Sequence, residues 1–235
     1  LQNVISGYAL RLESRRKKAK EAQERQVKLQ MEENALQSRI HMLSEMEKMY
    51  EGYSKAVKLV MGEARRGQLR GVHGPVAGLL HVPDAYAVAI ETALGGAMQH
   101  IVVDSEADGK AAIQFLKRRD GGRSTFLPLT SIRPSEFRDH GVEREPGFVG
   151  LGDGLIEFDP RYEKVFSTLL GRPVVAEDLD RAISMARKYG YRFRIVTLDG
   201  QVLNPGGSMT GGSASRSAGI LSRANELERL GQQHA

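Results

Sequence analysis

The first part of the chain carries an apolar residue at every seventh position and contains no proline. The residues that follow this repeat are Leu29, Leu36, Leu43, Tyr50 and Val57. A heptad repeat keeps one seam facing a partner helix, so the spacing predicts an N-terminal coiled-coil arm over residues 1–69. The companion apolar positions change flank near residues 40–46, which predicts a bend or break in the rod.

Beyond residue 70 the heptads give way to short β-branched runs that alternate with amphipathic segments, up to about residue 215. The two alternating periods predict a compact domain of mixed strands and helices, of the α+β class. After this domain, Leu227 and Leu230 stand at helical spacing. Residues 216–235 are therefore expected to begin a C-terminal coiled-coil arm.

One pattern occurs twice within the domain. A helix opened by proline, a short apolar strand, an acidic helix start, a second amphipathic helix and a closing strand appear in each half, and Tyr86 matches Tyr162 as Ile90 matches Phe166. A diverged duplication is the simplest explanation, although any two strand–helix units share some likeness. The predicted parts are the whole domain at 70–215, subdomain I at about 72–132, a Pro- and charge-rich connector at 133–149, and subdomain II at about 150–213.

The amino-acid composition excludes several kinds of chemistry for this chain. Of the 235 residues, positions 1–70 hold 15 Lys and Arg against 9 Asp and Glu, a net of +6, which leaves 19 against 20 elsewhere, a net of −1, so the basic excess belongs to the first segment. The absence of Cys excludes disulfides and thiolate catalysis and fits a cytoplasmic setting. No stretch approaches the ~20 apolar residues of a membrane helix, so no membrane partner is expected. The chain starts without Met, and we expect it to be a piece of a longer protein.

The densest glycine cluster is the run Asn204–Gly212, which directly follows an expected strand. Glycine tolerates positive φ and lets another backbone approach closely, so one interpretation is an exposed sheet edge that pairs with a second subunit. A second is a phosphate cradle, which would make this a small α/β nucleotide- or phosphate-binding enzyme domain using the loop Gly206–Gly212. A third is a flexible hairpin. No P-loop motif supports the phosphate interpretation.

Several basic clusters are candidates for non-specific contact with nucleic-acid phosphates. A charge run is more often a solvated helix face, and two sets stand out: the clusters where the arm enters the domain and those at the end of each second helix. The candidate DNA-binding residues are Arg65, Arg66, Arg70, Lys117, Arg118, Arg119, Arg187 and Lys188. No recognition-helix signature points to base-specific reading.

The sequence gives little support for a catalytic or metal-binding site. The six histidines are scattered, and no pair has metal-ligand spacing. Asp159 precedes Pro160 and is more typical of a helix cap than of an acid–base pair. Ser208 and Thr210 lie in the glycine loop, but no histidine has a sequence context that would make it their base. We therefore expect no catalytic residue, no metal and no cofactor in this chain.

The run Asn204-Pro-Gly-Gly-Ser-Met-Thr-Gly-Gly212, the stretch Gly122–Leu129 and the segment Gly71–Gly78 together resemble the hinge of structural maintenance of chromosomes (SMC) proteins, in the bacterial or archaeal form. The resemblance covers about residues 70–215, and the flanking heptads look like the adjoining coiled-coil arms. It implies a homodimer in which subdomain I of each chain docks on subdomain II of the other. The dimer-interface residues that it implies are Gly206, Gly207, Ser208, Met209, Thr210, Gly211 and Gly212.

The same resemblance implies a role in chromosome condensation and segregation. It places ATP and Mg²⁺ in head domains that this chain lacks, together with condensin-type accessory subunits that bind other regions, and it implies DNA contacts near the hinge without base reading. A nucleoid-associated location in the cytoplasm follows from it. The unequal lengths of the two arms are the one departure from the family pattern.

Overall fold

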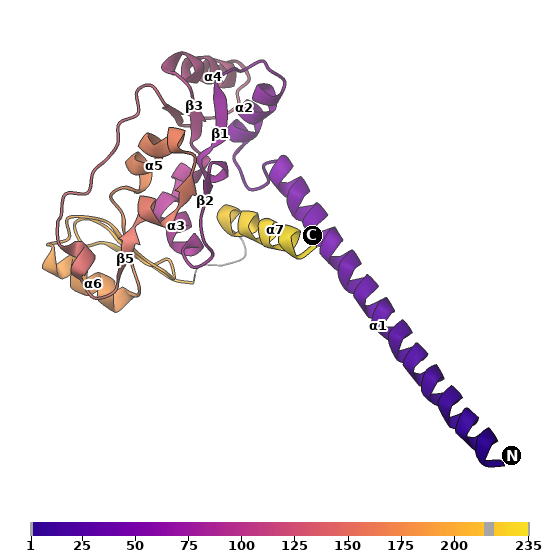
Figure 1. Cartoon of the computed structure of the whole chain (residues 1–235). Coiled ribbons are helices and arrows are strands. Elements are labelled where there is room, and N and C mark those ends of the chain that lie inside the picture. Colours follow the sequence, from indigo (N-terminus) through magenta and orange to yellow (C-terminus); the bar gives the residue numbers. More distant parts are fainter. Residues whose placement is uncertain (1, 214–218, 235) are drawn as a thin grey trace. The chain divides into compact units, whose positions relative to one another are not determined.

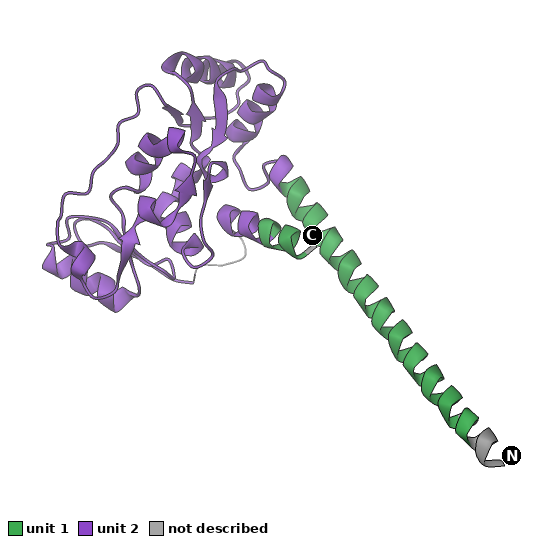
Figure 2. Cartoon of the chain, viewed as in Figure 1, with its two compact units in different colours: residues 1–46, 227–235 green, residues 47–226 purple. Residues whose placement is uncertain are grey.

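The computed structural model describes residues 2–213 and 219–234, and the chain divides into two compact units, coloured separately in Figure 2. The first comprises residues 1–46 and 227–235, and the second comprises residues 47–226. The predicted boundary between the domain and the second arm, at 215 and 216, lies outside the described residues.

Helices make up the first unit. Helix α1 (Gln2–Lys48) and the end of helix α7 (Ile220–His234) contribute to it. Leu43 and Leu230 are buried, whereas Leu29 further along the predicted seam is 55% exposed. Pairs such as Lys20 with Glu24 add only a few tenths of a kcal/mol to a lone helix. The exposed part of the seam therefore has the character of a coiled-coil strand that needs a partner.

The second unit begins at the end of α1. The helix continues without a break to Lys48, so the irregularity expected near 40–46 instead falls at residues 49–54, where Gly52 has a φ of +89°. Ser54 then caps helix α2 (Lys55–Arg65), accepting a hydrogen bond from the Val57 N–H. Because the buried face of α2 packs into the core of the second unit, the later heptad positions contact the domain.

Subdomain I is built on a three-stranded sheet. Its strands are β1 (Val72–Pro75), β3 (Ile101–Val103) and β4 (Phe126–Pro128), in the order β1-β3-β4. Strand β3 is antiparallel to β1 and parallel to β4, and helix α4 (Glu106–Arg118) makes the crossover between β3 and β4. Helices α2 and α4 cover one face of this sheet (Figure 1).

Subdomain II is built on a five-stranded sheet. Its strands are β5 (Phe148–Leu151), β7 (Val174–Ala176), β8 (Ile195–Thr197), β9 (Val202–Leu203) and β10 (Met209–Thr210), in the order β10-β9-β8-β7-β5. Strand β7 is antiparallel to β5 and parallel to β8. Helix α6 (Leu179–Lys188), capped by Asp178, makes the crossover. The pairings of β1, β3 and β4 thus recur in β5, β7 and β8, as a duplication predicts.

A shared core joins the two sheets. Alternate residues of a strand point to opposite faces, and Val102 of β3 and Val196 of β8 both face this core. Between them lie helices α3 (Ala87–Leu94) and α5 (Glu163–Leu170), whose Ile90 and Phe166 are fully buried. Strand β2 (Leu80–His81) of subdomain I also pairs with β6 (Glu157–Phe158) of subdomain II. Five 3-10 turns complete the fold: Val76–Gly78, Gly95–Gln99, Val142–Arg144, Gly152–Leu155 and Pro160–Tyr162.

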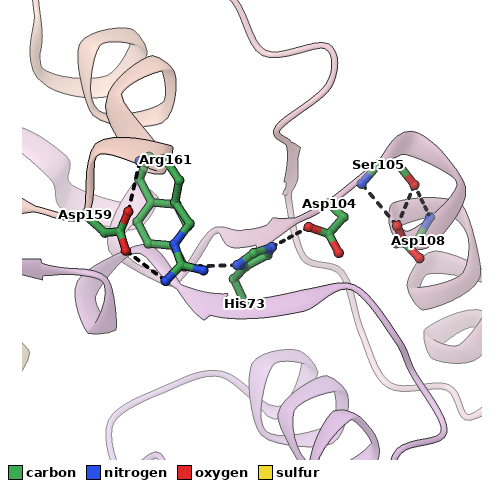
Figure 3. A network of polar contacts seen from close by, with 7 residues as sticks. His73, Asp104, Ser105, Asp108, Asp159 and Arg161 are labelled. Atoms are coloured by element: carbon green, nitrogen blue, oxygen red, sulfur yellow. Dashed lines mark hydrogen bonds and ion pairs between the residues drawn. The ribbon is translucent and has the colours of Figure 1, made fainter.

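Polar contacts reinforce the junction between the subdomains (Figure 3). His73 of β1 lies between Asp104 and Tyr162, with Nε2 2.7 Å from the Asp104 Oδ1 and Nδ1 3.0 Å from the Tyr162 hydroxyl. Asp159 accepts a hydrogen bond from the Arg161 N–H at 3.0 Å, which confirms its role as a helix cap. Burial raises the pKa of Tyr162, so its hydroxyl stays protonated and available to His73.

Two further side chains fasten chain segments to helix α3. Arg194, which precedes β8, donates to the Ala93 carbonyl at 3.0 Å and so satisfies a free carbonyl at the end of α3. Glu91 accepts a hydrogen bond from the Ile220 N–H at 3.2 Å, at the start of α7. Burial raises the pKa of Glu91. The second unit therefore behaves as one packed body in which subdomains I and II depend on each other.

Candidate interaction surfaces

Strand β10 ends the five-stranded sheet, and no other described strand pairs with its outer side. Its register opposite β9 places Met209 against Leu203, and just beyond the strand the Asn204 N–H donates to the Ser208 carbonyl at 2.8 Å. Hydrogen-bonded pairs alternate along an antiparallel ladder, so the backbone groups of Thr210 face β9. The N–H and carbonyl of Met209 and Gly211 therefore face outward.

Three glycines of this hairpin have backbone conformations that other residues adopt with strain. Gly206, Gly207 and Gly212 have φ values of +84°, +94° and +143°. The N–H groups of Gly206 and Gly207 are already used, because they donate to the Tyr191 and Asn204 carbonyls, each at 3.0 Å. These amides do not converge on an anion, so the hairpin gives no support to the phosphate-cradle interpretation.

The fourth glycine, Gly211, lies against a side chain of its own chain. A Cβ atom at this position would lie 2.2 Å from the Oε1 of Gln201, which is far inside van der Waals contact. The side chain of Gln201 lies along the strand here and bonds to the backbone of Gly212. Sequence reasoning did not single out Gln201, because nothing in a lone glutamine after an Asp-Gly turn signals such a contact.

Subdomain I has an open edge of its own at β4. The Ile101 N–H donates to the Thr125 carbonyl and the Leu129 N–H to the Val103 carbonyl, each at 2.9 Å. In a parallel pair this pattern turns the backbone of Leu127 toward β3 and that of Phe126 outward. Among the described residues, the three-stranded sheet ends in β1 and β4 and the five-stranded sheet ends in β10 and β5, so β4 and β10 are one outer strand of each sheet.

Three of the candidate DNA-binding residues are engaged within the chain. Arg65 donates to the Lys48 carbonyl at 2.8 Å and lies over the Tyr50 ring. Arg66 pairs with Glu63 at 2.7 Å. Lys188 pairs with the connector residue Glu145 at 2.5 Å; that hydrogen bond lowers the pKa of Glu145 and raises the pKa of Lys188. These cations help to fasten the arm root and the connector.

The cluster at the end of α4 is different. Lys117, Arg118 and Arg119 are exposed, and in the part of the chain that the structure describes their side chains form no hydrogen bond or ion pair. Lys55, at the start of α2, donates to the Asp120 carbonyl at 3.1 Å and so adds a cation beside them. The remaining candidates, Arg70 and Arg187, are also exposed and without such partners among the described residues.

Within residues 2–213 and 219–234, no group of three or more His, Asp or Glu side chains is placed to hold a metal ion. None of the described helices combines the length and apolarity needed to cross a bilayer.

Comparison with known proteins agrees with this architecture. The model of the SMC proteins flexible hinge domain matches residues 69–186, half of the chain. The chain belongs to the SMC family and contains its hinge domain.

Relatives in sequence and in structure can be named. The Bacillus subtilis chromosome partition protein Smc is 42% identical over 195 residues, which are 81% of this chain and 16% of that protein. An asymmetric dimer of the Geobacillus stearothermophilus SMC hinge domain has a TM-score of 0.78 at 43% identity, covering 87% of this chain and 83% of that one. The Pyrococcus furiosus hinge domain has a TM-score of 0.58 at 31% identity, covering 75% and 88%.

Proposed function

We propose that this chain is a homodimerisation hinge, held together by pairing of β10 of one copy with β4 of the other. The outward N–H and carbonyl groups of Met209 on an otherwise unpaired edge are the observation that supports it best. An exposed edge binds an extended strand through main-chain hydrogen bonds. The similar hinge domain from Geobacillus stearothermophilus was crystallised as a dimer, which supports the proposal further.

Two edges per chain lead to a closed assembly. If β10 of each copy pairs with β4 of the other, a two-fold axis relates two equivalent contacts, and neither β10 nor β4 is left to recruit a third chain. Release of one contact leaves the other holding the edges at high effective concentration. Such a dimer resists opening better than a single contact of the same strength would.

The chain spans 16% of the length of its Bacillus subtilis relative, so the wider role is part of the proposal. The hinge would join two long coiled-coil arms whose absent heads bind ATP and Mg²⁺, in a nucleoid-associated complex that acts in chromosome condensation and segregation. Accessory subunits would bind the absent regions. The hinge itself would be non-catalytic, since its described chemistry offers edges and cations.

The test of the dimer is sedimentation equilibrium of the chain over a range of concentrations. We expect a single species of twice the chain mass that dissociates only on dilution. A chain that sediments as a monomer at high concentration would refute the proposal. The same measurement gives the dissociation constant against which variants are compared.

DNA binding is proposed for the free cations at the end of α4. Reversing Lys117, Arg118 and Arg119 to Glu should weaken binding to duplex DNA of any sequence and flatten its dependence on salt. The reason is that the slope of log K against log salt falls by about 0.9 for every phosphate that is no longer neutralised. The matched control reverses three exposed cations outside the candidate set, Arg138, Lys164 and Arg172, so that both variants change the net charge by the same amount. Equal weakening in the two variants would indicate a diffuse charge effect and overturn the assignment.

A further inference from the structure

The side chain of Gln201, next to β10, makes the hydrogen bonds that a neighbouring strand would make. The Gln201 Oε1 accepts the Gly212 N–H at 2.8 Å, and the Gln201 Nε2 donates to the Gly212 carbonyl at 3.0 Å. A primary amide has the same acceptor and donor as a peptide group, so these two bonds hold Gly212 as a neighbouring strand would. The regular pairing of β9 with β10 ends at Thr210. The amide therefore continues it by two residues.

The Asp199 carboxylate fixes the orientation of this amide. Gln201 Nε2 lies 3.4 Å from the Asp199 carboxylate, which can only accept, so the NH₂ group must face that side and the oxygen must face the Gly212 N–H. The buried Thr197 hydroxyl donates to Asp199 and accepts the Gln201 N–H at 2.8 Å. A series of hydrogen bonds thus connects the buried Thr197 of β8 to the residues that follow β10.

The clamp formed by the Gln201 amide accounts for the residue types around it. A Cβ at Gly211 would displace this amide, and Gly212 has a φ of +143° that favours glycine. Glycine is also the residue that loses most conformational freedom when it is ordered. Two successive glycines after a two-residue strand would be costly to order on binding unless something orders them beforehand.

We propose that Gln201 is a positioning residue that preorganises the β10 edge before a second copy binds. This inference rests on the proposed homodimer. Its chemical basis is that the entropy of ordering the Gly211–Gly212 backbone is lost on folding of the single chain, so association does not have to supply it. Gln201 acts through Gly212, and its amide bonds are used within its own chain.

The experiment compares Gln201→Met, which keeps the length and removes both bonds, with Gln201→Glu, which keeps an acceptor for the Gly212 N–H. For Gln201→Met we expect the dimer dissociation constant to rise about tenfold. A symmetric dimer contains two clamps, and loss of each should weaken association about threefold, so the two factors multiply. Gln201→Glu should fall between Gln201→Met and the wild type. The control is Gln99→Met, which removes one side-chain bond, to the Ser54 N–H, away from β10.

A second readout separates preorganisation from general destabilisation. In monomers carrying Met209→Pro, hydrogen exchange at the Gly212 amide should accelerate on adding Gln201→Met, while exchange at Val196 in the core stays the same. If the wild type is dimeric and Gln201→Met has the same dimer dissociation constant, the role of Gln201 is overturned and the proposed dimer still stands. A wild-type chain that is monomeric would overturn the proposed dimer and, with it, the role of Gln201 in association.

Discussion

Replacing Phe166 with alanine should lower the free energy of unfolding by about 3–5 kcal/mol, and it should do so for both subdomains at once. The ring is fully buried, its centroid lies 4.7 Å from that of the tilted Phe158 ring, and its core cluster includes Ile90 of subdomain I. Removing the ring leaves a cavity in the core that residues of both sheets share. We therefore expect a single transition in urea, shifted to lower concentration, at fixed protein concentration.

Hydrogen exchange shows whether the destabilisation is shared. The amides of Val102 in β3 and Val196 in β8 should lose protection together, because both strands face the core that contains Phe166. Ile113→Ala is the control, since Ile113 is 54% exposed on α4 and its removal should change stability by no more than about 0.5 kcal/mol. If the amides of β8 lost protection and those of β3 kept it, the two subdomains would be independent folding units.

The second large effect is expected at the outer edge. Met209→Pro removes the outward N–H of β10 while leaving its inward ladder to β9, because proline is tolerated on an edge whose N–H faces solvent. Each contact of the dimer then lacks one hydrogen bond and leaves a partner carbonyl unsatisfied, at a cost of about 1–3 kcal/mol. Since a dimer has two contacts, its dissociation constant should rise about 30-fold or more.

Met209→Ala is the control for this variant, because it removes the side chain and keeps the N–H. Analytical ultracentrifugation should show Met209→Pro as a folded monomer at concentrations where Met209→Ala is still largely dimeric, and the far-ultraviolet circular dichroism of the two should match. Dimers of unchanged affinity in Met209→Pro would show that the contact between copies lies away from β10.

Patterns that repeat along the chain predicted the elements well. The matching of Tyr86 with Tyr162 and of Ile90 with Phe166 predicted a repeated unit, and the pairings of β1, β3 and β4 recur in β5, β7 and β8, while the subdomain boundaries stay a prediction. Apolar periodicity indicates which face of a helix or strand is buried, and it does not depend on which element packs against that face. It could not report that the inner faces of both subdomains meet in one core, because that depends on pairs such as Val102 and Val196 far apart in sequence.

The polar partners were the part that sequence reasoning missed. Arg65 and Lys188 read as free charge in the sequence, but they lie against the Lys48 carbonyl and Glu145, which the topology brings to them. In sequence, the glycines of the last hairpin suggest the approach of a second chain. The positive φ values of Gly206, Gly207 and Gly212 show that the fold of the single chain already favours glycine at these three positions. The interface residues Gly206–Gly212 therefore stay a prediction.

The most direct test of the pairing of β10 with β4 uses a natural advantage of this chain, which contains no cysteine. Thr125→Cys places one thiol beside β4, and Met209→Cys places another on β10 of a separate preparation. A short bis-maleimide should link the two variants into a covalent dimer when they are mixed and allowed to exchange, and it should link neither variant to itself. Self-linking of Met209→Cys, or no linking in the mixture, would contradict the pairing.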